Sequence, residues 1–444
     1  MNRRVLAFLV LAATLAPATT AYARVPEKTP KRLLEATVRR TMAGTPFLGA
    51  IPSVIVRRAG KIVLEINPSE PLQPASLLKL ATTAAAMHLW GPNHRFVTRV
   101  VAATGPGTGT INGSITLVGG GDPTLATAVY RRERFVGRPK PDDLHPIPSF
   151  KSGSPTIEDL ANSIKSAGVR HVTGDLIVDG TLFDEQRTQP GWIPIYLGND
   201  PEVGYLDGLT VNEGFSDPEG HGLLRVPSLS AGAFLKTALA KRGVTVLGKV
   251  RAGTAPTGAK PIARVQSPPL SELLFYINHW SINYGAEMLL KNLGAAFGKG
   301  GTTAEGTYVV FQTLQKLGIP LDGFHQVDGS GLSILNRVAP ATIAAILEYM
   351  LTAKGAEGAA LRASLPVAGQ PGTLFKRMRH TLAAGNLRGK TGTIKGVRAL
   401  AGWVTPLDGV PVVYVMLFNR VKKPSLVTSP LDFLGITLAH YPAP

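Results

Sequence analysis

The sequence predicts an α/β fold of the α+β type, in which an antiparallel sheet is flanked by helices and interrupted by a long β-rich insertion. Runs rich in β-branched residues stand near both ends of the chain, at 53–66 and 397–418, next to strongly helical segments. From 93 to 265, short β runs separated by glycine and proline prevail. Two halves of one domain, 24–92 and 266–444, would then reunite around the insertion. Three consecutive domains are the alternative.

The first predicted elements are a hairpin and a buried helix. Two β-rich runs flank Ala59-Gly60, a turn pair that predicts a β-hairpin. From Ser76 to Trp90 the residues favour a helix that is apolar almost all round, and a Gly-Pro pair ends it. A helix that is apolar on every side is usually buried in the middle of a domain.

The insertion and the segments after it complete the predicted fold. The segments 111–122 and 172–180 resemble each other, which predicts a weak internal β repeat. Beyond the insertion, the predicted elements are helices at 271–277, 285–291, 303–317 and 340–353 and strands at 397–404 and 412–418, the two strands paired through Asp408-Gly409.

Residues 1–23 have the features of a secretory signal peptide. Arg3 and Arg4 form a basic start, Val5–Ala16 is largely apolar, and Ala21-Tyr22-Ala23 has the small-x-small pattern of a cleavage site. The apolar stretch is too short to span a bilayer, which disfavours the alternative of an uncleaved anchor. The sequence therefore predicts export to the periplasm, with cleavage after Ala23.

Composition narrows the function further. The 444 residues include no cysteine, which excludes a disulfide framework, thiolate metal sites and a thiol nucleophile. The formal charge of +18 suits nucleic acid, an anionic surface or an enzyme that works among acidic polymers. Export and the scattered placement of the basic residues disfavour nucleic acid.

No His-Glu-x-x-His or Gly-x-Ser-x-Gly pattern occurs, which disfavours a zinc hydrolase and removes the nucleophile elbow of α/β-hydrolases.

Ser76 and Lys79 are candidates for nucleophilic catalysis. Three residues apart at the start of a helix, they project from the same side of its first turn. The backbone N–H of such a serine and the helix N-terminal field can face a developing oxyanion. A lysine held in an apolar pocket can lose its proton and act as a base. A serine cap followed by a surface lysine is the common alternative, and the pattern alone is weak evidence.

Ser281 and Asn283 form a second candidate pair, in the break between two helices. A hydroxyl there can relay a proton, and a carboxamide two residues away can hold a peptide amide. An ordinary helix-capping loop is the alternative.

A third candidate group, Lys390, Thr391 and Thr393, precedes the last hairpin. On an edge strand beside a cleft, a lysine and two hydroxyls suit a substrate carboxylate, and Gly392 lets another chain approach closely. A solvated strand end is the alternative.

In this order, the three patterns resemble the Ser-x-x-Lys, Ser-Asp-Asn and Lys-Thr-Gly motifs of β-lactamases and penicillin-binding proteins, with Ile282 in place of the aspartate in the second. The segments 74–80, 121–125, 328–333 and 389–393 resemble more narrowly the low-molecular-mass class C proteins, and within them the penicillin-binding protein 4-type D-alanyl-D-alanine carboxypeptidase/endopeptidase group, peptidase family S13. The resemblance covers essentially the mature chain and includes the insertion, which sets this group apart from β-lactamases. It implies a β-lactamase/transpeptidase-like domain.

The resemblance also implies a role for each candidate residue. Ser76 is expected to be the acylated nucleophile, Lys79 its base, and Ser281 the group that passes a proton to the leaving D-alanine. Asn283 is expected to bind the peptide amide. The terminal carboxylate of the substrate is expected to bind to Lys390, Thr391 and Thr393. The oxyanion that forms during acylation is expected to accept hydrogen bonds from the backbone N–H groups of Ser76 and Thr393. No metal or organic cofactor is implied.

The function implied is a serine-type D-alanyl-D-alanine carboxypeptidase, with endopeptidase activity as a further option, on peptidoglycan stem peptides. The expected partners include β-lactams as covalent inhibitors and, peripherally, anionic membrane or wall polymers, but no nucleic acid. A β-lactamase or esterase of the same fold, or a catalytically idle cell-wall-binding protein, is the alternative. Ile334-Leu335 stand where the family usually has an arginine and a polar residue, so substrate contacts there are expected to differ.

Overall fold

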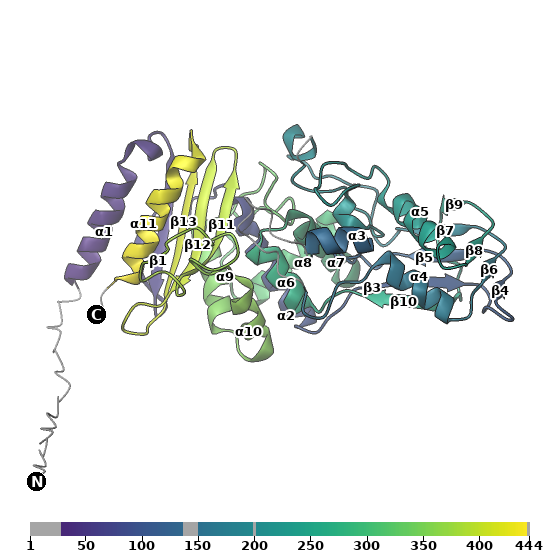
Figure 1. The fold of residues 1–444 in the computed structure, drawn as a ribbon. Helices are drawn as coiled ribbons and strands as arrows, with labels where there is room; N and C mark the ends of the chain where they lie inside the picture. Colours follow the sequence, from purple (N-terminus) through teal and green to yellow (C-terminus); the bar gives the residue numbers. More distant parts are fainter. Residues whose placement is uncertain (1–27, 136–149, 199–200, 442–444) are drawn as a thin grey trace, which may run out of the picture.

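The computed structural model describes residues 28–135, 150–198 and 201–441; the predicted signal peptide lies outside these ranges. The molecule is elongated (Figure 1). One five-stranded sheet forms one end, a layer of helices follows, and a second five-stranded sheet and a three-stranded sheet form the other end. Within the described ranges, no helix has the length and apolar character needed to cross a bilayer.

The first sheet joins strands from both ends of the chain. Its order is β11-β12-β13-β1-β2, with every neighbouring pair antiparallel and β11 at an edge. Ala59 and Gly60 both have positive φ, 48° and 74°, as a tight two-residue hairpin turn requires. The predicted hairpins are therefore confirmed. The strands are β1 (Ile51–Arg58), β2 (Lys61–Ile66), β11 (Arg388–Ile394), β12 (Val397–Val404) and β13 (Val412–Asn419).

Both faces of this sheet are covered by helices, because its central strands are apolar on both sides. In β13, Tyr414, Met416 and Phe418 face one core, whereas Val415 and Leu417 face the other. The first core is closed by the helices α1 (Lys28–Met42) and α11 (Thr428–Ala439), which lie together on the outer side of the sheet (Figure 1). The second core is closed by the helical layer.

The helical layer surrounds α2, whose residues from Lys79 to Met87 are all buried. The predicted helix starts at Ser76, but in the structure residues Ala75–Leu78 form a tighter 3₁₀ turn and the α-helix starts at Lys79. A 3₁₀ turn is common at a helix N-terminus. The helices of this layer are α2 (Lys79–Trp90), α6 (Leu270–His279), α7 (Asn283–Phe297), α8 (Thr303–Lys316), α9 (Pro340–Thr352) and α10 (Gly355–Ser364).

The other end of the molecule contains a repeat of three units, one more than predicted. Each unit is a two-residue strand, a glycine and a longer strand: β4–β5, β6–β7 and β8–β9. Equivalent strands pair in parallel, which brings the glycines 113, 174 and 248 into a row. A Cβ on Gly174 would lie 2.5 Å from the carbonyl carbon of Gly113, so this approach requires glycine. The third unit was missed because its longer strand, Val250–Ala252, is short and includes Arg251.

Two sheets hold these units, in the orders β10-β3-β5-β7-β9 and β4-β6-β8, with helices packed on one face. The strands are β3 (Val97–Ala102), β4 (Thr110–Ile111), β5 (Ile115–Val118), β6 (His171–Val172), β7 (Leu176–Asp179), β8 (Thr245–Val246), β9 (Val250–Ala252) and β10 (Lys260–Gln266). The helices are α3 (Ala128–Tyr130), α4 (Ile157–Ser166) and α5 (Pro227–Ala240). The predicted boundaries of the insertion, 93 and 265, stay a prediction.

Candidate active site

Ser76 and Lys79 lie at the head of α2 and contact each other. The Nζ of Lys79 donates a hydrogen bond to the Oγ of Ser76 at 2.9 Å. It also donates to the Oδ1 of Asn283 and to the backbone oxygen of Ser330, both at 2.7 Å. The Lys79 side chain has no solvent exposure. The structure thus holds the lysine against the serine with three acceptors.

The environment of Lys79 favours its neutral form more than water does. Burial lowers the pKa of Lys79 from its ordinary value of 10.5 to about 8, and the nearby carboxylates of Asp328, Glu287 and Glu202 oppose this shift. A substantial fraction of the amine is therefore unprotonated at mildly alkaline pH, and it can accept the proton of the Ser76 hydroxyl.

Ser281 and Lys390 form a second hydroxyl–amine contact. Ser281 lies between α6 and α7 with a positive φ of 62°, a conformation that is rare for a residue with a side chain. Its Oγ accepts a hydrogen bond from the Nζ of Lys390 at 2.7 Å, and the same amine donates to the oxygen of Thr391 at 3.0 Å. Burial and, secondarily, the like charge of Lys79 hold the pKa of Lys390 well below its ordinary value.

Asn283 is the first residue of α7, and hydrogen bonds fix both ends of its carboxamide. Its Oδ1 accepts from Lys79, and its Nδ2 donates to the backbone oxygen of Glu202 at 3.0 Å. These partners determine which end of the amide is the oxygen.

The edge strand β11 carries the third candidate group alongside the head of α2. A Cβ on Gly392 would lie 3.2 Å from the oxygen of Pro74 and 3.1 Å from the Cβ of Ala399, so this glycine permits the close approach. Thr393 pairs across the strands with Arg398, whose guanidinium donates a hydrogen bond to its Oγ1. The hydroxyl of Thr393 is thereby oriented at the strand edge.

An open cavity of about 780 Å³ lies over these groups. Its walls include five of the seven candidate residues, and the buried amines of Lys79 and Lys390 donate hydrogen bonds to four of those five. The structure therefore brings together all seven side chains, from segments up to 317 positions apart in the sequence. The five wall residues are Ser76, Ser281, Asn283, Thr391 and Thr393.

The loop 328–333, one of the segments that carry the family resemblance, supports the site. Glu287, which was not predicted, accepts hydrogen bonds from the backbone N–H groups of Gly329 at 3.0 Å and Ser330 at 2.8 Å. These bonds hold the Ser330 carbonyl that accepts from Lys79. Burial, aided by nearby Asp328, raises the pKa of Glu287 to about 8. The only signal in the sequence is an acid surrounded by apolar residues within a helix.

The described residues that follow β7, 182–198 and 201–206, also reach the site; together they are called the segment 182–206. The indole Nε1 of Trp192 donates to the Oδ2 of Asp328 at 3.0 Å. The hydroxyl of Ser333 donates to the oxygen of Pro190 at 2.6 Å, and the N–H of Ile334 donates to the oxygen of Gly191 at 3.2 Å. Ile334 thus contacts this segment through its backbone, and its side chain is partly exposed.

Comparisons with known proteins agree with this geometry. The model of the D-Ala-D-Ala carboxypeptidase 3 (S13) family matches residues 34–216 and 223–433. A D-alanyl-D-alanine carboxypeptidase from Actinomadura sp. is 30% identical over 88% of this chain and 82% of its own. Carboxypeptidase DacB from Mycolicibacterium smegmatis is 32% identical over 88% of this chain and 81% of its own.

A crystal structure of penicillin binding protein 4 from Haemophilus influenzae covers 90% of this chain and 98% of its own, with a TM-score of 0.73 and 22% identity. This likeness confirms the predicted fold class, a penicillin-binding-protein fold with antiparallel sheet and flanking helices. The predicted family is also confirmed. The chain belongs to the D-Ala-D-Ala carboxypeptidase 3 (S13) family.

Proposed function

We propose that this protein is a serine-type D-alanyl-D-alanine carboxypeptidase that acts on peptidoglycan stem peptides through an acyl-enzyme on Ser76. Membership of the family supports the reaction type. The observation that carries the assignment to Ser76 is the 2.9 Å contact between its Oγ and the Nζ of Lys79 on the floor of an open cavity. A buried amine of lowered pKa beside a hydroxyl is the arrangement expected of an activated nucleophile.

In the first step, unprotonated Lys79 takes the proton of Ser76 as its Oγ attacks the carbonyl carbon of the penultimate D-alanine. The backbone N–H groups of Ser76 and Thr393 stabilise the oxyanion. Collapse of the tetrahedral intermediate breaks the peptide bond, and the leaving amine takes a proton through Ser281. Water then attacks the ester, which releases the shortened peptide and restores the Ser76 hydroxyl.

The terminal carboxylate of the substrate lies on Lys390, Thr391 and Thr393, while Asn283 binds the peptide amide. The carboxylate supplies the counter-charge that buried Lys390 lacks, and so restores its cationic form when substrate binds. The two threonine hydroxyls line the cavity from the edge strand.

Other features belong to the same proposal. The leader of residues 1–23, with its basic start and its Ala-x-Ala site, supports export to the periplasm; the first residue of the mature protein is then expected to be Arg24. The sheet built from strands between Val97 and Gln266 supports an inserted unit at 93–265. Endopeptidase activity and association with anionic wall or membrane polymers are consistent with the large cavity and the basic composition.

The test is covalent labelling with a fluorescent penicillin, followed by mass mapping of the adduct, together with release of D-alanine from a diacyl-D-Ala-D-Ala peptide. Ser76 is expected to carry the label, and Ser76→Ala to lose both label and release. Ser166→Ala, an exposed serine at the end of α4, is the control and is expected to keep both.

An unlabelled Ser76 in folded protein would overturn the mechanism. Rapid hydrolysis of penicillin in place of a long-lived adduct would favour a β-lactamase or esterase. Folded protein that releases no D-alanine would favour a catalytically idle wall-binding protein.

A further inference from the structure

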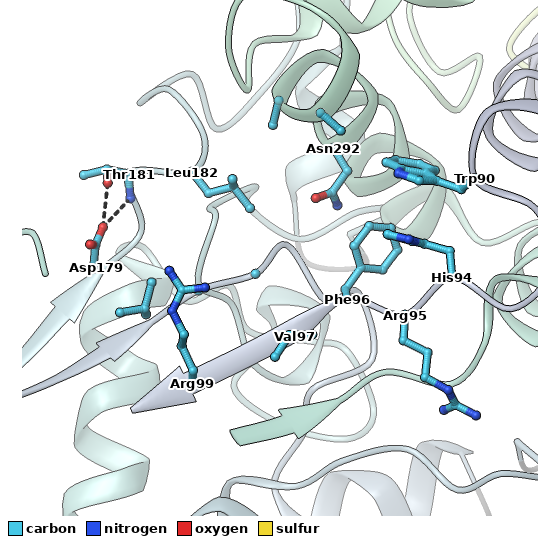
Figure 2. A pocket seen from close by; sticks show the side chains of 15 residues that line it. Trp90, His94, Arg95, Phe96, Val97, Arg99, Asp179, Thr181, Leu182 and Asn292 are labelled. Atoms are coloured by element: carbon cyan, nitrogen blue, oxygen red, sulfur yellow. Dashed lines mark hydrogen bonds between the residues drawn. The ribbon is translucent and has the colours of Figure 1, made fainter. Parts of the chain in front are cut away.

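A second cavity, of about 450 Å³, lies where the sheet containing β3 meets the far ends of α2 and α7 (Figure 2). This volume is in the range of small-molecule sites. Trp90 comes from the end of α2, Arg99 from β3 and Asn292 from α7. Asn292 is nine residues beyond Asn283, or about 14 Å along the helix axis, so this cavity is separate from the one over Ser76.

One wall of the second cavity is aromatic. Trp90 and His94 stack with their ring centroids 4.7 Å apart, and Phe96 meets Trp90 edge-on at 5.5 Å. Burial lowers the pKa of His94, which favours the neutral ring. Among the described residues, none accepts a hydrogen bond from the indole N–H of Trp90, whose side chain is half-buried. The wall therefore offers an apolar surface with one available donor.

The cavity has an excess of positive charge, because Arg95 and Arg99 line it together with one carboxylate, that of Asp179. The guanidinium of Arg99 extends into the cavity on the side of Asp179 and Leu182, across from Trp90 (Figure 2), and no described carboxylate lies within ion-pair distance of it. Its neighbour across the strands is another cation, Arg264, and like charges in this position repel. Asp179 also lines the cavity, but Thr181 and the N–H of Ala255 occupy its two oxygens.

Asn292 adds an acceptor. Both protons of its Nδ2 are committed, to the oxygens of Gly121 at 2.8 Å and Met288 at 2.9 Å. No donor from the described part of the chain reaches its Oδ1, and the residue points into the cavity (Figure 2). A fixed acceptor and a free indole donor thus line this cavity beside its aromatic wall, and an unpaired guanidinium lines it from the other side.

We propose that this cavity binds an acidic N-acetylated sugar, with the carboxylate on Arg99 and the acetamido or hydroxyl groups on Asn292 and Trp90. Guanidinium groups pair well with carboxylates, and aromatic walls accept the apolar faces of sugar rings. The source of the ligand rests on the proposed function, because the wall polymer that carries stem peptides contains such a sugar. Its carboxylate is free only where the peptide has been removed. The cavity is therefore expected to bind the enzyme to glycan strands from which the stem peptides have been removed.

The test is to measure the binding of monosaccharides to the mature protein by isothermal titration calorimetry or saturation-transfer NMR. N-acetylmuramic acid is expected to bind. N-acetylglucosamine, which lacks the carboxylate, and glucuronic acid, which lacks the acetamido group, are both expected to bind at least about tenfold more weakly. Because this comparison uses the unaltered protein, it does not depend on the folding of a variant.

Variants then locate the site. Arg99→Gln is expected to weaken binding of N-acetylmuramic acid about tenfold or more and to leave N-acetylglucosamine binding as it was. Arg264→Gln is the matched control, because Arg264 lies opposite Arg99 on the same sheet but does not line the cavity, and it is expected to bind normally. Trp90→Phe, which keeps a ring and loses the N–H, is expected to give a smaller loss than Arg99→Gln.

Equal binding of the sugars, equal loss in both arginine variants, or no saturable binding at millimolar sugar would overturn the proposal. Glucuronic acid binding as well as N-acetylmuramic acid would show a plain carboxylate site and would also overturn it. D-Alanine release is measured separately. If the sugars fail to bind, the assignment of Ser76 is unaffected, and if no D-alanine is released, the sugar site is unaffected.

Discussion

Lys79 and Lys390 are both buried, and each has a serine hydroxyl as a hydrogen-bond partner. Burial disfavours the charge of both amines. They differ in their surroundings, because acids lie near Lys79, whereas the charge near Lys390 is Lys79 itself. The first lysine is therefore suited to take a proton, and the second to receive an anionic substrate.

The lowered pKa of Lys79 predicts the pH dependence of acylation. Since the lysine acts as a base in its unprotonated form, the acylation rate should rise with pH, with a midpoint near pH 8, and fall about tenfold per pH unit well below it. Stopped-flow acylation by benzylpenicillin between pH 6 and 10 measures this. In Lys79→Arg, whose guanidinium keeps its proton, the acylation rate should fall roughly 100-fold or more. A flat profile in the native enzyme would contradict the role of Lys79.

At the scale of elements, the loop 328–333 and the 3₁₀ turn before α2 fit together through a glycine. Gly331 has a φ of 87°, and a Cβ there would lie 1.9 Å from the oxygen of Ala75. Ala75 itself has a positive φ of 48°. Two unusual backbone conformations thus meet beside the nucleophile, as is common where strain is held at a functional site.

Gly331→Ala should therefore destabilise the protein by roughly 2–5 kcal/mol, through left-handed strain and a clash with the backbone of Ala75. Gly318→Ala is the control, because Gly318 has a similar φ of 72° with nothing within 4 Å of the added Cβ. It should cost only about 1–2 kcal/mol. Urea unfolding measures both free energies. Equal losses would show that the clash with Ala75 is relieved without cost.

At the scale of the whole molecule, the segment 182–206, which follows β7, links the sheets at one end of the molecule to the site. This segment contacts the loop 328–333 through Trp192 and supplies the carbonyl of Glu202 that holds Asn283. Through this segment, the distant sheets help to fix the position of Asn283 and of the loop 328–333.

Trp192→Phe should slow acylation several-fold, because it removes the 3.0 Å hydrogen bond to Asp328, and hydrogen bonds to charged groups are worth about 1.5–3 kcal/mol. Trp192→Ala, which also removes the ring, should lose more. Penicillin acylation rates and thermal midpoints are the measurements, with Ser166→Ala as control. An acylation rate in Trp192→Phe equal to that of the native enzyme would show that this contact does not position the site.

Much of the site could be predicted from the sequence, because its chemistry is local. Ser76–Lys79, Ser281–Asn283 and Lys390–Thr393 are short patterns in which spacing along one turn or strand fixes which side chains share a face. Glu287 could not be predicted. Its function depends on burial against the backbone of Gly329 and Ser330, some 42 residues away, which no local spacing encodes.

By itself the sequence determined the fold class through its periodicity and the three motifs through their local spacing, and the resemblance of those motifs to known proteins indicated the family. Only the tertiary structure decided the rest. It joined the three motifs over one cavity, added a third repeat unit, placed the segment 182–206 at the site and left Arg99 unpaired on the wall of a second cavity. Each of these depends on contacts between distant residues, whose partners are set by packing and burial rather than by neighbours in the chain.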